Sequence, residues 1–135
     1  MSQSAGSVSR LKLVAEVANK GTAAEWELVR HLAPVTAGAI LKALPVQDRV
    51  HRFEDKFVYI ETCLVIGAEK QRTQFRRGDI ALMPSNGGIC FIVRDCTVRP
   101  MNPVGRMGEE SIEIIEASQA GDVIVVKKRP AITTA

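Results

Sequence analysis

The sequence is poor in aromatic residues, which make up 4% of its 135 residues. Proteins that bind nucleic acids usually combine a basic stripe with aromatic side chains that stack on the bases. Here the formal net charge is only +3, and the two basic clusters, Arg76–Arg77 and Lys127–Arg129, are short. We therefore expect no nucleic-acid partner, and we interpret both clusters as solvated strand ends.

Long apolar runs and paired cysteines are missing as well. Apolar runs such as Val123–Val126 are far too short to cross a bilayer. The cysteines, Cys63, Cys90 and Cys96, are odd in number and irregularly spaced, which favours reduced thiols over a disulfide framework. Residues 1–9 are rich in Ser and Gly and lack the apolar core of a secretory signal. From these features we expect a cytoplasmic protein without a membrane partner.

The length of the chain corresponds to one domain. Hydrophobic residues make up 46% of the sequence and charged residues 24%, which is typical of a globular protein. We expect a flexible N-terminus over residues 1–9, a single domain over residues 10–129, and a tail over residues 130–135.

Alternating apolar residues bounded by Gly, Pro and Asn predict about eight short strands. The segment Ala24–Leu28 also suits a short helix, because Ala, Glu and Leu favour that conformation. The predicted strands are Leu11–Val17, Ala24–Leu28, Val50–Phe53, Phe57–Ile60, Ile80–Met83, Ile89–Val93, Val104–Met107 and Val123–Val126. Thr62–Ile66 is one further apolar stretch.

Two segments predict short helices. The first begins at Pro34 and ends before Pro45, with Thr36 expected to cap its first turn through the side-chain hydroxyl. The second starts at Glu109, where acidic residues suit the positive end of a helix dipole. Many short strands with few helices predict a mainly β protein, either a closed barrel or a sandwich.

Motifs for metals and cofactors are missing from the sequence. The candidate ligands His31, His51, Cys63, Cys90 and Cys96 show no spacing typical of a zinc site, although a site assembled only by the fold stays open. Neither a phosphate-binding loop nor the nucleophile elbow of a serine hydrolase is present. The sequence therefore predicts no metal and no cofactor.

One constellation remains, in the segment Val50–Phe57. It holds an Arg on a predicted strand, followed five residues later by a Phe across a tight turn. This resembles the catalytic strand of the cyclophilins, in which Phe-His-Arg is followed by four residues and then Phe. By this resemblance Arg52 matches the catalytic Arg, and Phe57 matches the aromatic wall of the proline pocket. The chain departs from the pattern at Ile60, where these enzymes have Gln, and Trp26 lies outside the region of their pocket Trp.

Nearly the whole chain is also similar to small uncharacterised prokaryotic proteins with a cyclophilin-like barrel. The matching segments, in chain order, are Ala43–Pro45, Val50–Ile60, Arg77–Ile80, Met83–Phe91, Asn102–Arg106 and Gly121–Val123. This resemblance implies a closed, antiparallel, eight-stranded cyclophilin-like β-barrel with two short helices, filled by its own side chains.

The resemblance implies a shallow cleft around Arg52 on the outer face of the barrel. Our leading hypothesis is a module that binds a small molecule or a peptide. One alternative is a weak peptidyl-prolyl cis–trans isomerase acting on a proline-containing peptide, in which a guanidinium donates to the prolyl nitrogen. Another is an oligomeric structural protein that pairs its edge strands. Arg52 as an ordinary solvated strand residue is equally compatible with the sequence. The candidate residues are Arg52 as the catalytic group and, for binding, Phe53, Phe57, Met83, Phe91 and Asn102.

Overall fold

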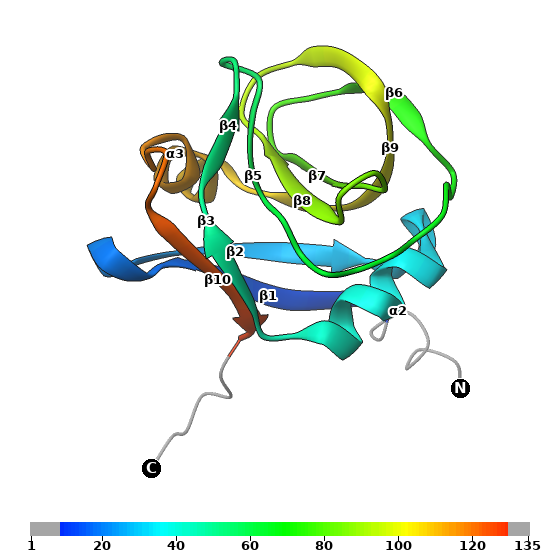
Figure 1. Ribbon diagram of the computed structural model, residues 1–135, viewed down its shortest axis with the longest axis horizontal. Coiled ribbons are helices and arrows are strands. Elements are labelled where there is room, and N and C mark those ends of the chain that lie inside the picture. The colour runs from blue at the N-terminus through cyan, green and yellow to red at the C-terminus, as the bar shows by residue number, and fades with distance from the viewer. Residues whose placement is uncertain (1–8, 130–135) are drawn as a thin grey trace.

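The computed structural model describes residues 9–129, so the predictions for residues 1–8 and 130–135 lie outside the described residues. Figure 1 shows a strand-rich fold with two α-helices. The strands are β1 (Arg10–Val17), β2 (Thr22–Val29), β3 (Val46–Arg49), β4 (His51–Phe53), β5 (Phe57–Ile60), β6 (Arg72–Phe75), β7 (Asp79–Met83), β8 (Gly88–Ile92), β9 (Cys96–Met107) and β10 (Val123–Lys128). The helices are α2 (Pro34–Ala43), α3 (Glu109–Glu116) and the short 3₁₀ segments η1 (Ala18–Lys20) and η2 (Arg30–Leu32).

The strands pair into one antiparallel sheet of ten strands. Its order is β3-β10-β1-β2-β9-β7-β8-β5-β4, and β6 pairs with β9 beside this path. The sheet rolls up, as Figure 1 shows, because its two end strands, β3 and β4, follow one another in the chain and are separated only by Val50. The prediction of a mainly β, antiparallel fold with two helices is confirmed.

The predicted closed barrel of eight strands is wrong. Among residues 9–129 the hydrogen-bonded path has two ends, at β3 and β4, so the sheet is not closed. With β6 beside the path, the sheet holds ten strands rather than eight. The roll is completed by the covalent chain, because one bent strand supplies both ends of the sheet. Sequence patterns did not reveal this bend, since no Gly or Pro interrupts residues 46–53 to mark it.

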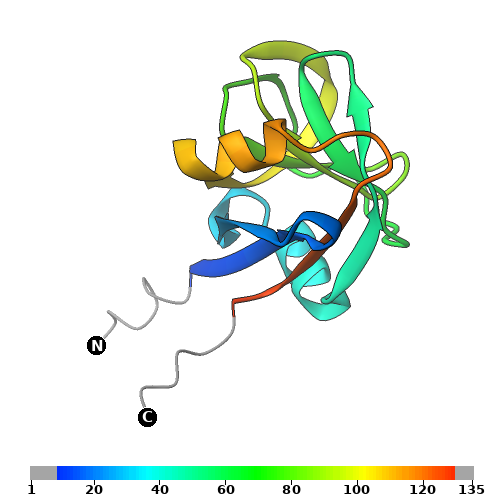
Figure 2. The ribbon, with the colours of Figure 1, turned by 90° about the vertical axis from the view of Figure 1, so that its left-hand side faces the viewer.

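The larger of two hydrophobic cores lies between the two halves of the rolled sheet. Trp26 of β2 meets Phe91 of β8 there, edge to face, with ring centroids 5.9 Å apart. The helices lie at opposite ends of the roll in Figure 1, and α3 faces the viewer in Figure 2. Ile40 of α2 and Ile112 of α3 both join this core.

The smaller core lies on the other face of β5, β8 and β7. Neighbouring residues of a strand point to opposite faces of the sheet, so Val58 belongs to the larger core and Phe57 to the smaller one. The smaller core consists of Phe57, Phe75, Ala81, Cys90, Ile92 and Met101. This part of the sheet is therefore buried on both faces, which explains why all five residues of β8 are buried.

Three local predictions change in the structure. The segment Thr22–Val29 is a strand and pairs with β1 in a hairpin, so the predicted strand is confirmed and the helical alternative is wrong. The stretch Thr62–Ile66 forms no strand. The strand expected at Val104–Met107 begins earlier, at Cys96, and includes two prolines that mask it in the sequence.

The N-terminus of α2 is capped by Glu69 and not by Thr36 as predicted. The Glu69 carboxylate accepts hydrogen bonds from the backbone N–H groups of Val35 (3.0 Å) and Thr36 (2.8 Å) and from the Thr36 hydroxyl (2.7 Å). Burial opposes ionisation of this carboxyl group, but the hydrogen bonds outweigh it and hold the pKa of Glu69 below its ordinary value. The loop between β5 and β6 is thereby tied to the helix.

We expect Glu69→Ala to lower the free energy of unfolding at pH 7 by about 1–2 kcal/mol, because three donors of α2 lose their acceptor. Glu69→Gln retains an acceptor oxygen and should lose less. Since the folded pKa is depressed, this stabilisation is complete above about pH 5 and fades as the pH falls through the folded pKa. Urea denaturation at pH 7 and at pH 3 measures both effects. A difference between native protein and Glu69→Ala that grows on acidification would contradict the assignment.

Candidate functional site

The bend at Val50 positions the candidate site. The N–H of Val50 donates to the carbonyl oxygen of Asp122 (2.6 Å), and its own carbonyl oxygen accepts from the N–H of Gly121 (3.2 Å). Before the bend β3 pairs with β10, and after it β4 pairs with β5. The turn that precedes β10 therefore holds the bend through backbone groups on both sides of one residue.

Arg52 and Phe57 lie on opposite faces of the β4–β5 hairpin. Phe53 pairs directly with Phe57, and Arg52 pairs with Val58. Paired residues share a face and adjacent residues alternate, so Arg52 lies on the Val58 side and Phe57 on the other. The two side chains do not project into one groove, and the predicted arrangement is wrong in this respect.

The Arg52 guanidinium contacts the C-terminal end of α3. Its Nη1 donates to the carbonyl oxygens of Ser118 (2.6 Å) and Glu116 (3.2 Å). Carbonyl groups at a helix C-terminus carry partial negative charge and lack partners within the helix. A cation here stabilises the end of α3 and joins it to the bent strand.

A cavity of about 570 Å³ opens on the face that carries Phe53 and Phe57. We call it the aromatic cavity. It is lined by Phe53, Lys56, Phe57, Tyr59, Met83, Ser85, Asn86, Thr97, Val98, Arg99 and Met101. The Phe53 and Phe57 rings stack with centroids 5.0 Å apart, and the Tyr59 ring lies 5.8 Å from that of Phe57. Three aromatic rings thus form one continuous wall.

The predicted binding residues divide between this cavity and the interior. Phe53, Phe57 and Met83 line the aromatic cavity. Phe91 is fully buried against Trp26 in the larger core. Asn102 is also buried, and its amide bonds to Thr36 Oγ1 and two backbone groups of the β5–β6 loop. The structure therefore brings together three of the six predicted residues and gives Arg52, Phe91 and Asn102 structural contacts elsewhere.

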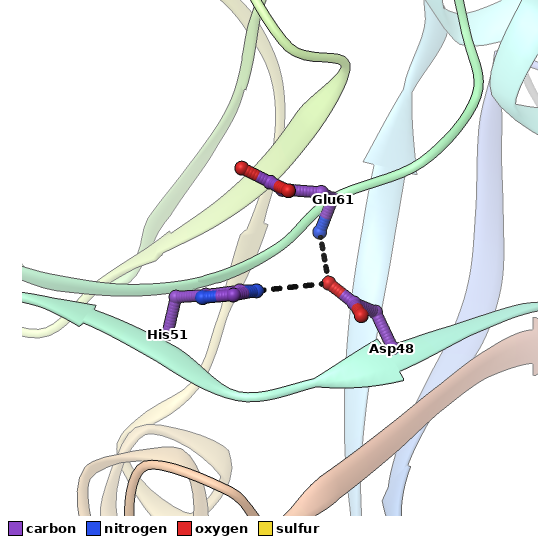
Figure 3. Close-up of side chains that lie close together, drawn as sticks. All are labelled: Asp48, His51 and Glu61. Atoms are coloured by element: carbon purple, nitrogen blue, oxygen red, sulfur yellow. Dashed lines mark hydrogen bonds and ion pairs between the residues drawn. The ribbon is translucent and has the colours of Figure 1, made fainter.

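A second group of polar side chains, the bend cluster, consists of Asp48, His51 and Glu61. Figure 3 shows the His51 ring pointing toward Asp48, with a distance of 3.1 Å between Nε2 and Oδ2. The same Oδ2 accepts the backbone N–H of Glu61 (2.8 Å). Burial opposes ionisation of the Asp48 carboxyl group. The hydrogen bonds to Glu61 and His51, together with one from the Arg49 N–H, outweigh this effect, so the pKa of Asp48 stays below its ordinary value.

The bend cluster adjoins the aromatic cavity. The imidazole of His51 stacks on the Tyr59 ring, with centroids 5.1 Å apart and 23° between the planes. The side-chain amide of Asn86 donates to the Glu61 carboxylate (3.0 Å). Tyr59 and Asn86 both line the cavity, so they form a shared wall between the two features.

Comparison with known proteins assigns the family. The model of the cyclophilin-like family matches residues 31–127. The chain belongs to the cyclophilin-like family. This confirms the resemblance drawn from the sequence. No curated protein matches the sequence of this family member.

Two solved structures share the fold. The solution structure of the hypothetical protein AF2241 from Archaeoglobus fulgidus has a TM-score of 0.72 and 23% identity, over 90% of this chain and 96% of that chain. The structure of McbB in complex with tryptophan has a TM-score of 0.72 and 14% identity, over 91% of this chain and 46% of that chain. This chain thus spans about half the length of McbB. Within residues 9–129, no helix combines the length and apolar character needed to cross a bilayer.

Sequence reasoning missed the cavity residues Lys56, Tyr59 and Arg99 and two members of the bend cluster, Asp48 and Glu61. The sequence could, however, have predicted that Arg52 and Phe57 lie on opposite faces. A hairpin loop of Glu54–Lys56 sets Phe53 against Phe57, and alternation then places Arg52 on the opposite face. The contact between Asp48 and His51 could not be predicted from the sequence, because residues three apart in a straight strand point to opposite faces.

We expect Arg52→Ala to lower the free energy of unfolding by about 1 kcal/mol, a modest value because the side chain is exposed. The cause is the loss of two charge-assisted hydrogen bonds at the end of α3. Urea denaturation measures the change, and Arg10→Ala, which removes an exposed arginine paired with Glu27 on β1–β2, serves as the matched control. Equal stability of native protein and Arg52→Ala would show that these bonds contribute nothing.

Proposed function

We propose that this protein is a binding module for a small molecule that carries a planar ring and an anionic group. The aromatic cavity is the proposed binding site, in place of the cleft around Arg52 that the sequence suggested. The observation that carries the proposal is a cavity wall of three aromatic rings combined with basic side chains and no acidic ones.

The rings supply the apolar part of the site. Phe53 stands at the rim with 41% of its surface exposed, whereas the other five aromatic side chains are buried or half-buried. A flat ligand ring packed against Phe53 and Phe57 would bury surface that water now covers. Ligand sites commonly combine such an apolar wall with a few convergent polar groups, here provided by Ser85, Asn86 and Thr97.

The charge of the lining favours an anion. Lys56 and Arg99 line the cavity, and no Asp or Glu does. Lys56 already lies 3.4 Å from the Glu54 carboxylate. Among residues 9–129, no ion pair or side-chain hydrogen bond engages the Arg99 guanidinium, so it is available to a ligand carboxylate. A planar guanidinium is well suited to such a group, because it can donate two parallel hydrogen bonds.

The fold neighbour McbB was solved in complex with tryptophan, a planar ring bearing a carboxylate. At 14% identity that likeness concerns the fold, so the proposal rests on the lining of this chain's own cavity. The neighbour does supply a reasonable family of probes, namely indole compounds of differing charge.

We expect indole-3-acetate and L-tryptophan to bind and tryptamine to bind at least about tenfold more weakly, because its ammonium group meets Lys56 and Arg99. Two-dimensional NMR titration measures both the affinity and the location. Phe53→Ala and Arg99→Gln should each weaken the binding of indole-3-acetate about tenfold, and Arg10→Ala should not. Equal affinity for the acid and the amine, or shifts confined to residues outside the cavity, would count against the proposal.

A peptide isomerisation assay distinguishes the isomerase alternative from the binding module. With Arg52 bound to the end of α3 and the aromatic wall on the other face, we expect a proline-containing peptide to isomerise at its uncatalysed rate. Native protein and Arg52→Ala should then give the same rate, with an active cyclophilin as the positive control. A native rate that exceeds the uncatalysed rate and falls in Arg52→Ala would favour the isomerase instead.

A further inference from the structure

We propose that the bend cluster, Asp48, His51 and Glu61, binds a divalent transition-metal ion of the zinc type. This site goes beyond the proposed function and does not depend on it. It uses one imidazole nitrogen and carboxylate oxygens from three neighbouring segments: β3, β4 and the residue after β5.

The spacing of the first two ligand atoms suits a metal. His51 Nε2 and Asp48 Oδ2 lie 3.1 Å apart. Nitrogen and oxygen ligands bound at about 2.0–2.2 Å from one ion lie roughly 2.9 Å apart at a right angle and roughly 3.4 Å apart in a tetrahedron. The observed separation falls between these values, so an ion can take the place of the hydrogen bond between the two atoms with little movement.

The third ligand needs a small rearrangement. The three ligand atoms all lie within 4.8 Å of one another, which is wider than the span of a tetrahedral site. The Glu61 carboxylate must therefore approach by rotation of its side chain. Glu61 is exposed and held by the Asn86 amide, so the approach displaces one hydrogen bond and no buried group.

Asp48 and His51 are held in place by their surroundings. The backbone N–H of Glu61 donates to the Asp48 carboxylate, and the Tyr59 ring stacks on the imidazole of His51. Contacts of this outer kind commonly orient metal ligands. In a straight strand Asp48 and His51 would lie about 10 Å apart on opposite faces. The bend at Val50 is what aligns them.

The donor set indicates the class of metal. One imidazole with carboxylates suits Zn²⁺, Co²⁺ or Ni²⁺, whereas Mg²⁺ and Ca²⁺ favour oxygen ligands alone. Side chains of His51 and Asp48 are 39% and 30% exposed, so an ion can enter from solvent. Three protein ligands leave at least one coordination position for water or for an oxygen of another molecule.

The test is calorimetric titration of the protein with Zn²⁺ and Ni²⁺. It uses a Cys63→Ser background, because an exposed thiol also binds zinc. We expect one ion per chain, a rise in melting temperature with the metal, and no binding of Mg²⁺. Asp48→Asn, Glu61→Gln and His51→Phe should each weaken binding at least about tenfold. His51→Phe keeps a ring for stacking on Tyr59, and Asp48→Asn keeps an oxygen that can accept the Glu61 N–H.

Matched controls are His31→Phe and Asp55→Asn, which change an imidazole and a carboxylate outside the bend cluster and should leave the affinity unchanged. The absence of zinc and nickel binding, or an affinity that persists in Asp48→Asn and His51→Phe, overturns the metal site. Titration with indole-3-acetate in the presence of EDTA tests the aromatic cavity without any metal. Failure of one proposal is thus distinguishable from failure of the other.

Discussion

The fold depends on the pair of backbone hydrogen bonds that Val50 makes with Gly121 and Asp122. These bonds bend one strand so that its first half extends the β10 side of the sheet and its second half extends the β5 side. A flat antiparallel sheet of this length would expose a hydrophobic face to water. The bend instead turns that face inward, where it encloses the larger core around Trp26 and Phe91.

The two faces of the β4–β5 hairpin, which follows the bend, make different contacts. One face of the hairpin directs Arg52 to the end of α3 and Val58 into the larger core. The other face carries the stacked rings of Phe53 and Phe57, and His51 on Tyr59. The residue that matches a catalytic arginine by sequence thus makes a structural contact, and the proposed ligand site lies on the opposite side of the same strands.

Much of the fold follows from short-range patterns in the sequence. Alternation and turn residues suffice for the β1–β2 and β4–β5 hairpins, and acidic residues before an amphipathic segment suffice for α3. Short-range patterns did not predict the cap of α2 or the bend at Val50, because these features depend on Glu69 and on the Gly121–Asp122 turn, which come from distant parts of the chain. The cavity itself was not predicted, although three residues of its lining, Phe53, Phe57 and Met83, are among those selected from the sequence. Arg99 lies in the proline-containing part of β9, where no strand was predicted.

The presence of two cores, one on each face of β5, β8 and β7, has a consequence for divergence within the family. The aromatic cavity opens over the smaller core, to which Phe57 and Met101 belong, whereas the rolled architecture rests on the larger one. Side chains at the rim, such as Phe53 and Arg99, can be exchanged without disturbing the packing between the two halves of the sheet. In a scaffold of this kind, the lining of the proposed site can change by substitution on one surface alone, with the architecture intact.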